Sequence, residues 1–258
     1  MARYKLILAY DGTGFEGSQR QTRWSSSGAS HSTSRPRTVQ GELESALRKL
    51  GWPGRSVTLA GRTDTGVHAS GQVAAFDFEW AHSIEKLRDA LNANLPVDVA
   101  VQSVEIADAD FNPRFDATSR RYRYRLFCQN VRDPLRGKLA WRVWPEVDES
   151  WLIEAAQVFL GQHDFAAFGS APRKGSSTTR TVKLSEWKKA DGGWQYEVQA
   201  DAFLYRMVRR LVYVQVAVAQ GRYSIEIVAQ ALEKPQFKNR IPAGLAPAHG
   251  LTLVEVTY

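Results

Sequence analysis

One carboxylate of this chain lies among residues that favour a tight loop facing a ligand. The segment 60–72 (AGRTDTGVHASGQ) holds Asp64 together with an arginine, a histidine, two threonines and three glycines. Glycines allow backbone angles and close approaches that other residues resist, so such a loop can present one acid to a ligand. Arg62 lies two positions before Asp64 and favours the ionised carboxylate. From these residues alone, a turn in which Asp64 only caps its own backbone is an equal alternative.

A metal site is the second chemistry that this segment suggests. Asp64 and His68 are four positions apart, so on a helix they would share one face. Gly66 and the β-branched residues on either side of it disfavour a helix, and the five histidines of the chain show no metal-ligand spacing. We therefore expect no metal site.

The binding of a dinucleotide cofactor is the third chemistry that the sequence suggests. The segment 12–17 (GTGFEG) has the glycine spacing of dinucleotide-binding proteins and follows a predicted strand. That fingerprint also needs a helix directly after the glycines and an acidic residue about twenty positions further on. A Ser-rich segment follows here instead, and the acidic residue is missing, so we expect no cofactor.

The overall charge favours a polyanion as partner. The chain carries 34 Lys and Arg residues against 27 Asp and Glu, and 24 of the basic residues are arginine, whose planar group suits phosphates and stacks on bases. Cys128 is the only cysteine, which excludes an intrachain disulfide and suits a reducing cytosol. Since no apolar run approaches the length of a membrane span, we expect a cytoplasmic protein without membrane contact.

Arginines and tyrosines alternate in the segment 120–127 (RRYRYRLF). In a strand, Arg121 and Arg123 would line one face, and Tyr122 and Tyr124 the other. Positive charge for a backbone combined with rings for unstacked bases is typical of single-stranded RNA binding. The open alternative is an edge strand with a solvated arginine face and a tyrosine face in the core.

A second basic stripe is predicted on a helix over Leu204–Ala219. Arg206, Arg209 and Arg210 recur at helical spacing on one side, whereas most other positions are apolar. A basic stripe on a buried helix is costly unless it faces an anion or a carboxylate. Asp64 is the candidate carboxylate for one of these arginines.

The elements that must position these residues form two similar halves. In the first half we predict strands at 3–10, on both sides of Asp64 and at 98–106, with helices after Thr38 and Ser83. The second half repeats this with helices at 152–160, at 204–219 and after Ser224, and strands at 120–127, 179–187, 194–200 and 251–258. Because the strands come in pairs, the fold class is α+β with a mostly antiparallel sheet, divided into residues 1–107 and 108–258.

A Ser/Arg-rich insert at 21–37 interrupts the first half. It is poor in aliphatic residues and cannot bury enough apolar surface to order itself. Two interpretations stay open: a flexible arm that contacts phosphates through Arg23, Arg35 and Arg37, or a tolerated loop insertion.

At this point the chain resembles the TruA family of tRNA pseudouridine synthases. The segment GRTDTGVHA around Asp64 looks like the signature of that family. Further resembling motifs follow in family order: YDGT (10–13), TVQ (38–40), LNANLP (91–96), RRYRY (120–124), LGQHDF (160–165), MVR (207–209) and GL (250–251). The resemblance covers nearly the whole chain.

The resemblance implies the pseudouridine synthase fold, with two α/β halves and a central basic cleft, and a reaction that needs no cofactor. Uridine in the anticodon stem-loop of tRNA, at nucleotides 38, 39 and 40, is detached from C1′, turned and rejoined through C5. Asp64 would be the catalytic aspartate, and the residues do not decide whether it adds to the base, attacks C1′ or removes a sugar proton. Base extrusion costs a few kcal/mol, which contacts to the everted nucleotide must offset.

By the same resemblance, Tyr122 would stack on the base, Arg62 would help to evert the nucleotide, Arg209 would pair with Asp64, and Leu251 would form part of an apolar wall. Further candidates for RNA contact are Arg20, His68, Arg121, Arg123, Arg206 and Arg210. The family acts as homodimers, so we expect a homodimer that binds tRNA. A tRNA binder or folding helper without catalysis is the alternative.

The chain departs from the family pattern at two places. The family usually has Gly-Trp-Gln after the first strand, whereas this chain has Gly17-Ser18-Gln19. The Ser/Arg-rich insert is also longer than the usual connection. Both departures bear on the range of substrates rather than on the type of reaction.

Overall fold

A computed structural model describes residues 1–20, 36–171, 173, 175–234, 236 and 239–258. The chain divides into two compact units, Met1–Ala117 (unit 1) and Thr118–Tyr258 (unit 2). The boundary expected at 107/108 lies at the end of β4, inside unit 1. The insert expected at 21–37 lies outside the described residues except for Pro36 and Arg37.

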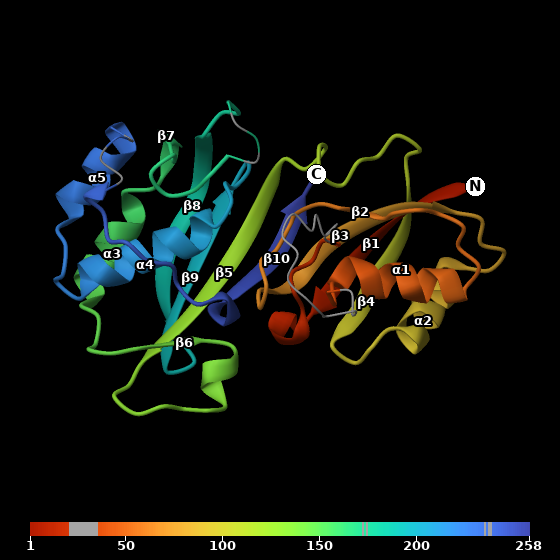
Figure 1. Cartoon of the computed structure of the whole chain (residues 1–258), viewed down its shortest axis with the longest axis horizontal. Coiled ribbons are helices and arrows are strands. Elements are labelled where there is room, and N and C mark those ends of the chain that lie inside the picture. The colour runs from red at the N-terminus through yellow and green to blue at the C-terminus, as the bar shows by residue number, and fades with distance from the viewer. Residues whose placement is uncertain (21–35, 172, 174, 235, 237–238) are drawn as a thin grey trace, which may run out of the picture. The chain divides into compact units, whose positions relative to one another are not determined.

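Unit 1 is an antiparallel sheet with two helices (Figure 1). Its elements are β1 (Ala2–Tyr10), the 3-10 helix η1 (Gly12–Gly14), α1 (Val39–Lys49), β2 (Thr58–Leu59), β3 (His68–Phe78), α2 (Ile84–Asn94) and β4 (Val99–Ala107). The strand β1 lies between β4 and β3, and β2 pairs with β3. The predicted strands of this half are confirmed.

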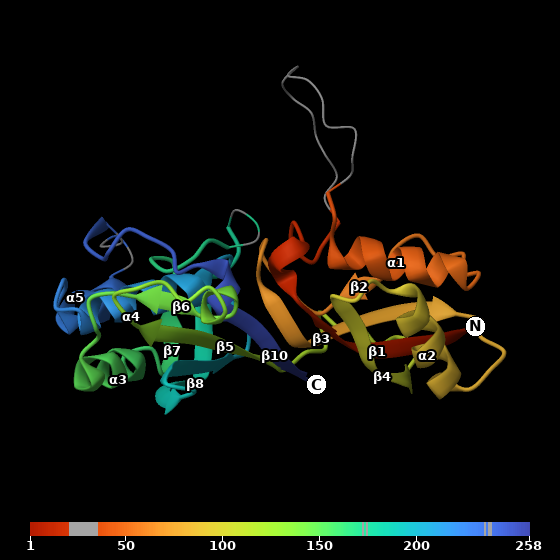
Figure 2. The ribbon, with the colours of Figure 1, turned by 90° about the horizontal axis from the view of Figure 1, so that it is seen from below.

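Local capping signals set the starts of both helices in unit 1. The Thr38 side chain accepts a hydrogen bond from Gly41 N at the start of α1, and the Ser83 side chain accepts one from Lys86 N at the start of α2. The buried faces of both helices share one core with β1 and β3, which includes Leu6, Leu43 and Leu87. Figure 2 shows α1 lying along the strands of this unit.

Unit 2 holds mostly antiparallel strands and three α-helices among its described residues. Its elements are β5 (Ser119–Cys128), η2 (Arg136–Lys138), β6 (Trp141–Val143), α3 (Glu149–Gln157), β7 (Gly161–Asp164), β8 (Thr179–Ala190), β9 (Gly193–Ala200), α4 (Met207–Ala219), α5 (Ile225–Glu233), η4 (Ala248–Gly250) and β10 (Leu251–Thr257). The sheet order is β10-β5-β9-β8-β7, and every neighbouring pair is antiparallel. Only β6 is parallel to its partner β5 within this unit's described residues. The predicted α+β class is confirmed.

The hairpin β8–β9 turns where the sequence predicts it. Asp191 and Gly192 have φ angles of 52° and 68°, and Ala190 pairs with Gly193 across the turn. Two successive left-handed residues twist a two-residue turn in the sense that matches the strands, and Asp-Gly is a favoured pair for it.

The predicted helix over 204–219 begins later than expected, at Met207. Arg206 has a φ of 62°, which is left-handed and incompatible with the first turn of a helix. Arg206 is therefore not on the helical stripe with Arg209 and Arg210; its exposed guanidinium lies over the Tyr205 ring, 4.8 Å from the centroid. The rest of α4 is buried on most sides, as the apolar pattern predicts.

Among the residues that the structure describes, the helices are all too short or too polar to cross a membrane.

Candidate active site

The Asp64 loop, residues 61–67, connects β2 to β3 in unit 1. Arg62 is exposed, Thr63 is buried and Asp64 is half-buried, so the loop holds one residue in the core next to the partly exposed acid. Gly66 has a φ of 78°, a left-handed angle that glycine adopts without strain. The expected loop is too long at its C-terminal end, because the backbone from His68 onward pairs with β1, beginning with Ala69 opposite Tyr10.

A buried polar cluster holds Thr63, the residue before Asp64. Ser18 Oγ accepts a hydrogen bond from Thr63 N at 2.8 Å, and Ser18 N donates to Thr63 O at 3.1 Å. The hydroxyl groups of Thr63 and Tyr10 are 2.9 Å apart and share a hydrogen bond. Burial raises the pKa of Tyr10, so its phenol stays protonated at neutral pH. Both the backbone and the side chain of Thr63 are therefore fixed.

Gln72 on β3 closes the other side of the loop. Its Nε2 donates to Gly61 O at 2.9 Å, and its Oε1 accepts from Gly61 N at 3.3 Å. Gln72 is fully buried, so this two-way contact is protected from water. The first residue of the loop is thus tied to the strand that follows the loop.

The glycines of segment 12–17 allow close packing against the Asp64 loop. A Cβ on Gly12 would lie 2.0 Å from Val67 O, and a Cβ on Gly17 would lie 2.9 Å from Thr63 O. Gly17 also has a φ of 94°. The first two glycines lie in the short 3-10 helix η1, so the segment forms a wall for the loop instead of the turn of a dinucleotide site.

His68 is buried at the start of β3 and faces this wall. Its Nδ1 accepts a hydrogen bond from Gly12 N at 3.0 Å and lies 3.1 Å from Asp11 Oδ1. Burial raises the pKa of Asp11, but hydrogen bonds from the Thr13 hydroxyl and backbone N–H outweigh it, so the pKa lies below its ordinary value. No cluster of three or more His, Cys, Asp or Glu side chains that could hold a metal occurs in the described part of the chain.

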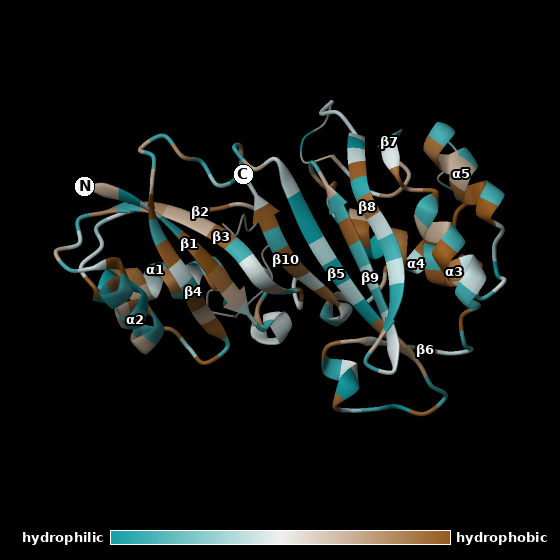
Figure 3. Cartoon of the chain, turned by 180° about the vertical axis from the view of Figure 1, so that it is seen from behind, coloured by the Kyte–Doolittle hydropathy of each residue, from teal (hydrophilic) through white to brown (hydrophobic). Residues whose placement is uncertain are grey.

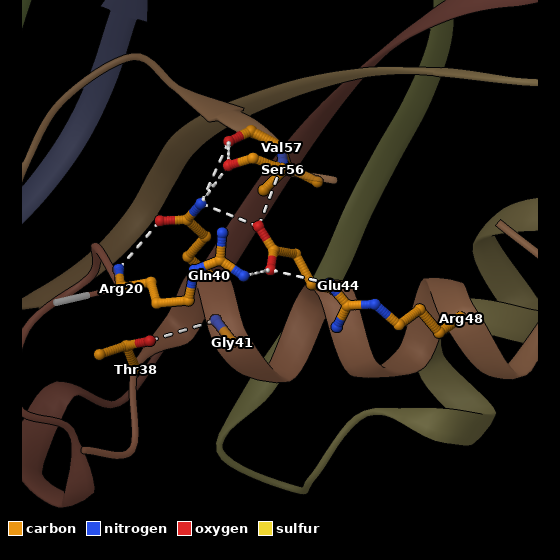
Figure 4. Close-up of polar contacts among 8 residues, drawn as sticks. All are labelled: Arg20, Thr38, Gln40, Gly41, Glu44, Arg48, Ser56 and Val57. Carbon is orange, nitrogen blue, oxygen red and sulfur yellow. Dashed lines mark hydrogen bonds and ion pairs between the residues drawn. The ribbon is translucent and has the colours of Figure 1, made fainter. Parts of the chain in front are cut away.

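Arg20 belongs to an ionic cluster around the buried Glu44 of α1 (Figure 4). Its guanidinium NH1 donates to Glu44 Oε2 at 2.8 Å, and its backbone N donates to Gln40 Oε1 at 2.9 Å. Glu44 is 1% exposed, and its Oε1 also accepts from Val57 N at 3.2 Å. The cluster ties the residues after segment 12–17 to α1 and to the residue before β2.

Tyr122 lies in the middle of β5 in unit 2. It is 8% exposed, it pairs with Val198 and Leu253 on the two neighbouring strands, and its ring meets Phe203 edge-on at 5.1 Å. Tyr124 and Leu126 are buried too, so the predicted alternation along β5 is confirmed. Hydrophilic residues of β5 appear in teal in Figure 3.

Two arginines of β5, Arg121 and Arg123, form ion pairs with carboxylates rather than being simply solvated. Arg123 Nε and NH2 both donate to Glu197 Oε1, at 2.9 and 2.7 Å. Arg121 NH1 donates to Glu197 Oε2 at 3.3 Å, and Arg121 NH2 donates to Glu255 at 2.8 Å. Glu197 lies opposite Arg123 on β9, a register that the sequence pattern does not reveal.

The described contacts of Arg209 and Arg210 on α4 go to backbone carbonyl groups. Arg209 Nε donates to Ala246 O at 2.8 Å, and Arg210 NH1 donates to Gly244 O at 2.7 Å. After Ala246 the chain continues through η4 to Leu251, the first residue of β10. Leu251 is 5% exposed and pairs with Tyr124 on β5. Burial raises the pKa of Tyr124 well above its ordinary value, and the Arg209 charge opposes this shift.

The two units thus hold different parts of the predicted site. Asp64, Arg62, His68 and Arg20 lie in unit 1, whereas Tyr122, Arg209, Leu251, Arg121, Arg123, Arg206 and Arg210 lie in unit 2. The expected pair of Arg209 with Asp64 stays a prediction. Sequence reasoning missed the roles of Tyr10, Ser18 and Gln72; the only signals were the motif that begins at Tyr10 and the departure from the family pattern at Ser18.

Comparison with known proteins identifies the family. The family model described as tRNA pseudouridine synthase matches residues 10–116 and 155–258. A protein of Chloroflexus aurantiacus named tRNA pseudouridine synthase A is 39% identical over 100% of this chain and 89% of its own length. Proteins of the same name are 37% identical in Listeria innocua, over the whole of both chains, and 40% identical in Methylacidiphilum infernorum, over 99% of this chain and 95% of that one. The chain therefore belongs to the tRNA pseudouridine synthase family, whose members are isomerases.

Proposed function

We propose that this chain converts uridine to pseudouridine in the anticodon stem-loop of tRNA, with Asp64 as the catalytic carboxylate. The observation that carries the proposal is the half-buried Asp64 on a loop whose neighbouring residue is fixed by buried hydrogen bonds. Likeness over full length to relatives named tRNA pseudouridine synthase A supports the reaction and the substrate.

The reaction requires acid–base or nucleophilic catalysis but no oxidant or reductant. The N1–C1′ bond breaks, a C5–C1′ bond forms, C5 loses a proton and N1 gains one, so atoms and electrons balance within the uridine. A glycoside hydrolase normally uses two carboxylates because it must also activate water. Here water must be kept from C1′, and one carboxylate suffices.

The substrate roles belong to the same proposal. Arg62 is exposed next to Thr63 on the Asp64 loop, where a guanidinium can contact an everted nucleotide. Tyr122 is proposed to stack on the base, Leu251 to supply an apolar contact and Arg209 to supply a positive charge for the carboxylate. Arg20, His68, Arg121, Arg123, Arg206 and Arg210 are proposed as further RNA contacts.

Arg121 and Arg123 both form ion pairs with Glu197, so only part of their positive charge is available to attract RNA phosphates. Their effect on tRNA affinity should therefore be smaller than that of an unpaired arginine. We also propose that the protein acts as a homodimer in the cytoplasm.

Tritium release tests the proposal. Uridine labelled at C5 in tRNA should lose tritium to water with the wild-type protein, and Asp64→Asn and Asp64→Ala should abolish the release while binding tRNA. Asp89→Asn is the matched control, because that carboxylate is exposed on α2 and pairs only with its neighbour Arg88 among the described contacts. Activity retained by both Asp64 variants would refute the catalytic role.

Substitution of single uridines then maps the sites. Loss of release only when uridines of the anticodon stem-loop are replaced by cytidines supports the substrate assignment. Binding of tRNA by a wild-type protein that releases no tritium would instead establish a non-catalytic tRNA binder.

A further inference from the structure

Ser18 lies at the contact between α1 and the Asp64 loop. It is fully buried. Ser18 Oγ accepts from Thr63 N at 2.8 Å, Ser18 N donates to Thr63 O at 3.1 Å, and Ser18 O accepts from Gln40 N at 2.9 Å. Each polar group of this one residue is therefore bonded to the loop or to the helix, and the hydroxyl also interacts with the Tyr10 phenol.

Several hydrogen bonds hold the helix end of this contact. Gln40 is the second residue of α1, and its N–H is one of the first-turn donors that have no partner inside a helix. The carbonyl of Ser18 satisfies that donor, while the Thr38 side chain satisfies Gly41 N. The Gln40 side chain also holds Arg20 N and lies in the cluster around buried Glu44 (Figure 4). Ser18 is thus anchored to a helix that is packed into the core.

The loop end of the contact fixes two successive peptide planes. The bond from Thr63 N fixes the plane between Arg62 and Thr63, and the bond to Thr63 O fixes the plane between Thr63 and Asp64. Gly17 strengthens this docking, because its missing side chain lets the backbone approach Thr63 O. The Cα position of Asp64 therefore depends directly on Ser18.

We propose that the Ser18 hydroxyl is a positioning residue that sets the carboxylate of Asp64 for reaction. This inference rests on the proposed function. The hydroxyl holds the loop directly, by the side-chain hydrogen bond that it accepts from Thr63 N. Without the hydroxyl, the buried Thr63 N–H loses its acceptor, and the peptide plane between Arg62 and Thr63 turns toward another partner. Misplacing a reacting group by about 1 Å can cost about 100-fold in rate.

The test compares Ser18→Ala with Ser185→Ala. Ser185 is also buried, and its Oγ lies 2.7 Å from both Ala156 O and Tyr196 Oη, but it belongs to β8 in unit 2. In single-turnover tritium release with saturating enzyme, Ser18→Ala should lower the rate about 10- to 100-fold and leave the Kd for tRNA within about twofold. Ser185→Ala should leave the rate unchanged. Equal rates for wild type and Ser18→Ala would overturn the catalytic consequence.

A third variant separates the hydrogen bond from packing. Ser18→Cys fills the same space with a sulfur that is a weak acceptor, so it should be slow like Ser18→Ala. A normal rate for Ser18→Cys would show that packing, and not the hydrogen bond, positions the loop.

Hydrogen exchange tests the positioning without reference to the reaction. Peptides spanning residues 60–67 should exchange faster in Ser18→Ala than in wild type, and at the wild-type rate in Ser185→Ala. Unchanged exchange would overturn the positioning role even in an active enzyme. A wild-type protein that releases no tritium would refute the proposed function, while the exchange result still decides whether Ser18 holds the loop.

Discussion

Glu44 allows the strongest test of the packing that supports the candidate site. Its buried carboxylate accepts four hydrogen bonds (Figure 4). Oε1 accepts from Gln40 Nε2 at 2.9 Å and Val57 N at 3.2 Å, and Oε2 accepts from Arg20 NH1 at 2.8 Å and Arg48 NH2 at 3.2 Å. Two substitutions of Glu44 separate the contribution of the bonds from the exposed arginines from that of the bonds from Gln40 and Val57.

Glu44→Gln should cost about 1–2 kcal/mol of unfolding free energy. The new amide can keep its oxygen toward Gln40 and Val57, so only the two arginine bonds are lost. The side chains of Arg20 and Arg48 are 43% and 48% exposed, so both can turn to water, and exposed ion pairs contribute about 0–1 kcal/mol each. The amide nitrogen facing two guanidinium groups adds a small penalty.

Glu44→Met should cost about 3–4 kcal/mol, although it keeps the volume of the side chain. Methionine offers no acceptor, so Val57 N–H is left buried without a partner at about 1–3 kcal/mol, in addition to the loss of the arginine bonds. Gln40 Nε2 loses less, because it still donates to Ser56 Oγ at 2.8 Å. The two variants should therefore differ by about 2 kcal/mol.

Urea unfolding followed by pulsed hydrogen exchange measures this difference on peptides of unit 1 separately. Glu149→Gln is the control: Glu149 is half-exposed, pairs with Lys189 in unit 2 and should change stability by less than about 1 kcal/mol. If Glu44→Met were as stable as Glu44→Gln, the buried bonds to Gln40 and Val57 would not contribute, and the reasoning would be refuted.

Two further predictions concern the packing of segment 12–17 and the pH dependence of unit 1. Gly12→Ala should slow the reaction more than tenfold, because its Cβ would lie 2.0 Å from Val67 O. Gly14→Ala, whose Cβ would meet the Arg37 side chain at 3.1 Å, should leave the rate close to that of the wild type; equal rates for the two variants would contradict the close-packing argument. Hydrogen bonds from Arg37 hold the pKa of Asp98 below its ordinary value, so Asp98 contributes stability that is present above about pH 4 and is lost as the pH falls through the folded-state pKa. The destabilisation by Asp98→Asn, about 1–2 kcal/mol at pH 7, should shrink in acid, and a pH-independent difference would be the contrary result.

Much of the fold follows from local rules that the sequence displays. Thr38 and Ser83 satisfy the first backbone donors of their own helices, Asp191 and Gly192 adopt the left-handed angles of a hairpin turn, and alternation buries Tyr122 on β5. Each of these features depends on residues within four positions of one another. The family is likewise visible in the sequence, because motif residues carry it directly, and the same motifs give the prediction that Asp64 is the catalytic acid.

Only the tertiary structure decided what surrounds those residues. Pairing with β1 extends β3 back to His68, a left-handed Arg206 precedes α4, and Glu197 forms ion pairs with two arginines of β5. Ser18 reaches Thr63 across 45 positions of the chain. Such contacts are set by strand register and by the docking of a helix on a sheet, and neither leaves a periodic signal in the sequence. The sequence therefore predicts which residue is the acid, and the packing of distant segments determines how its loop is held.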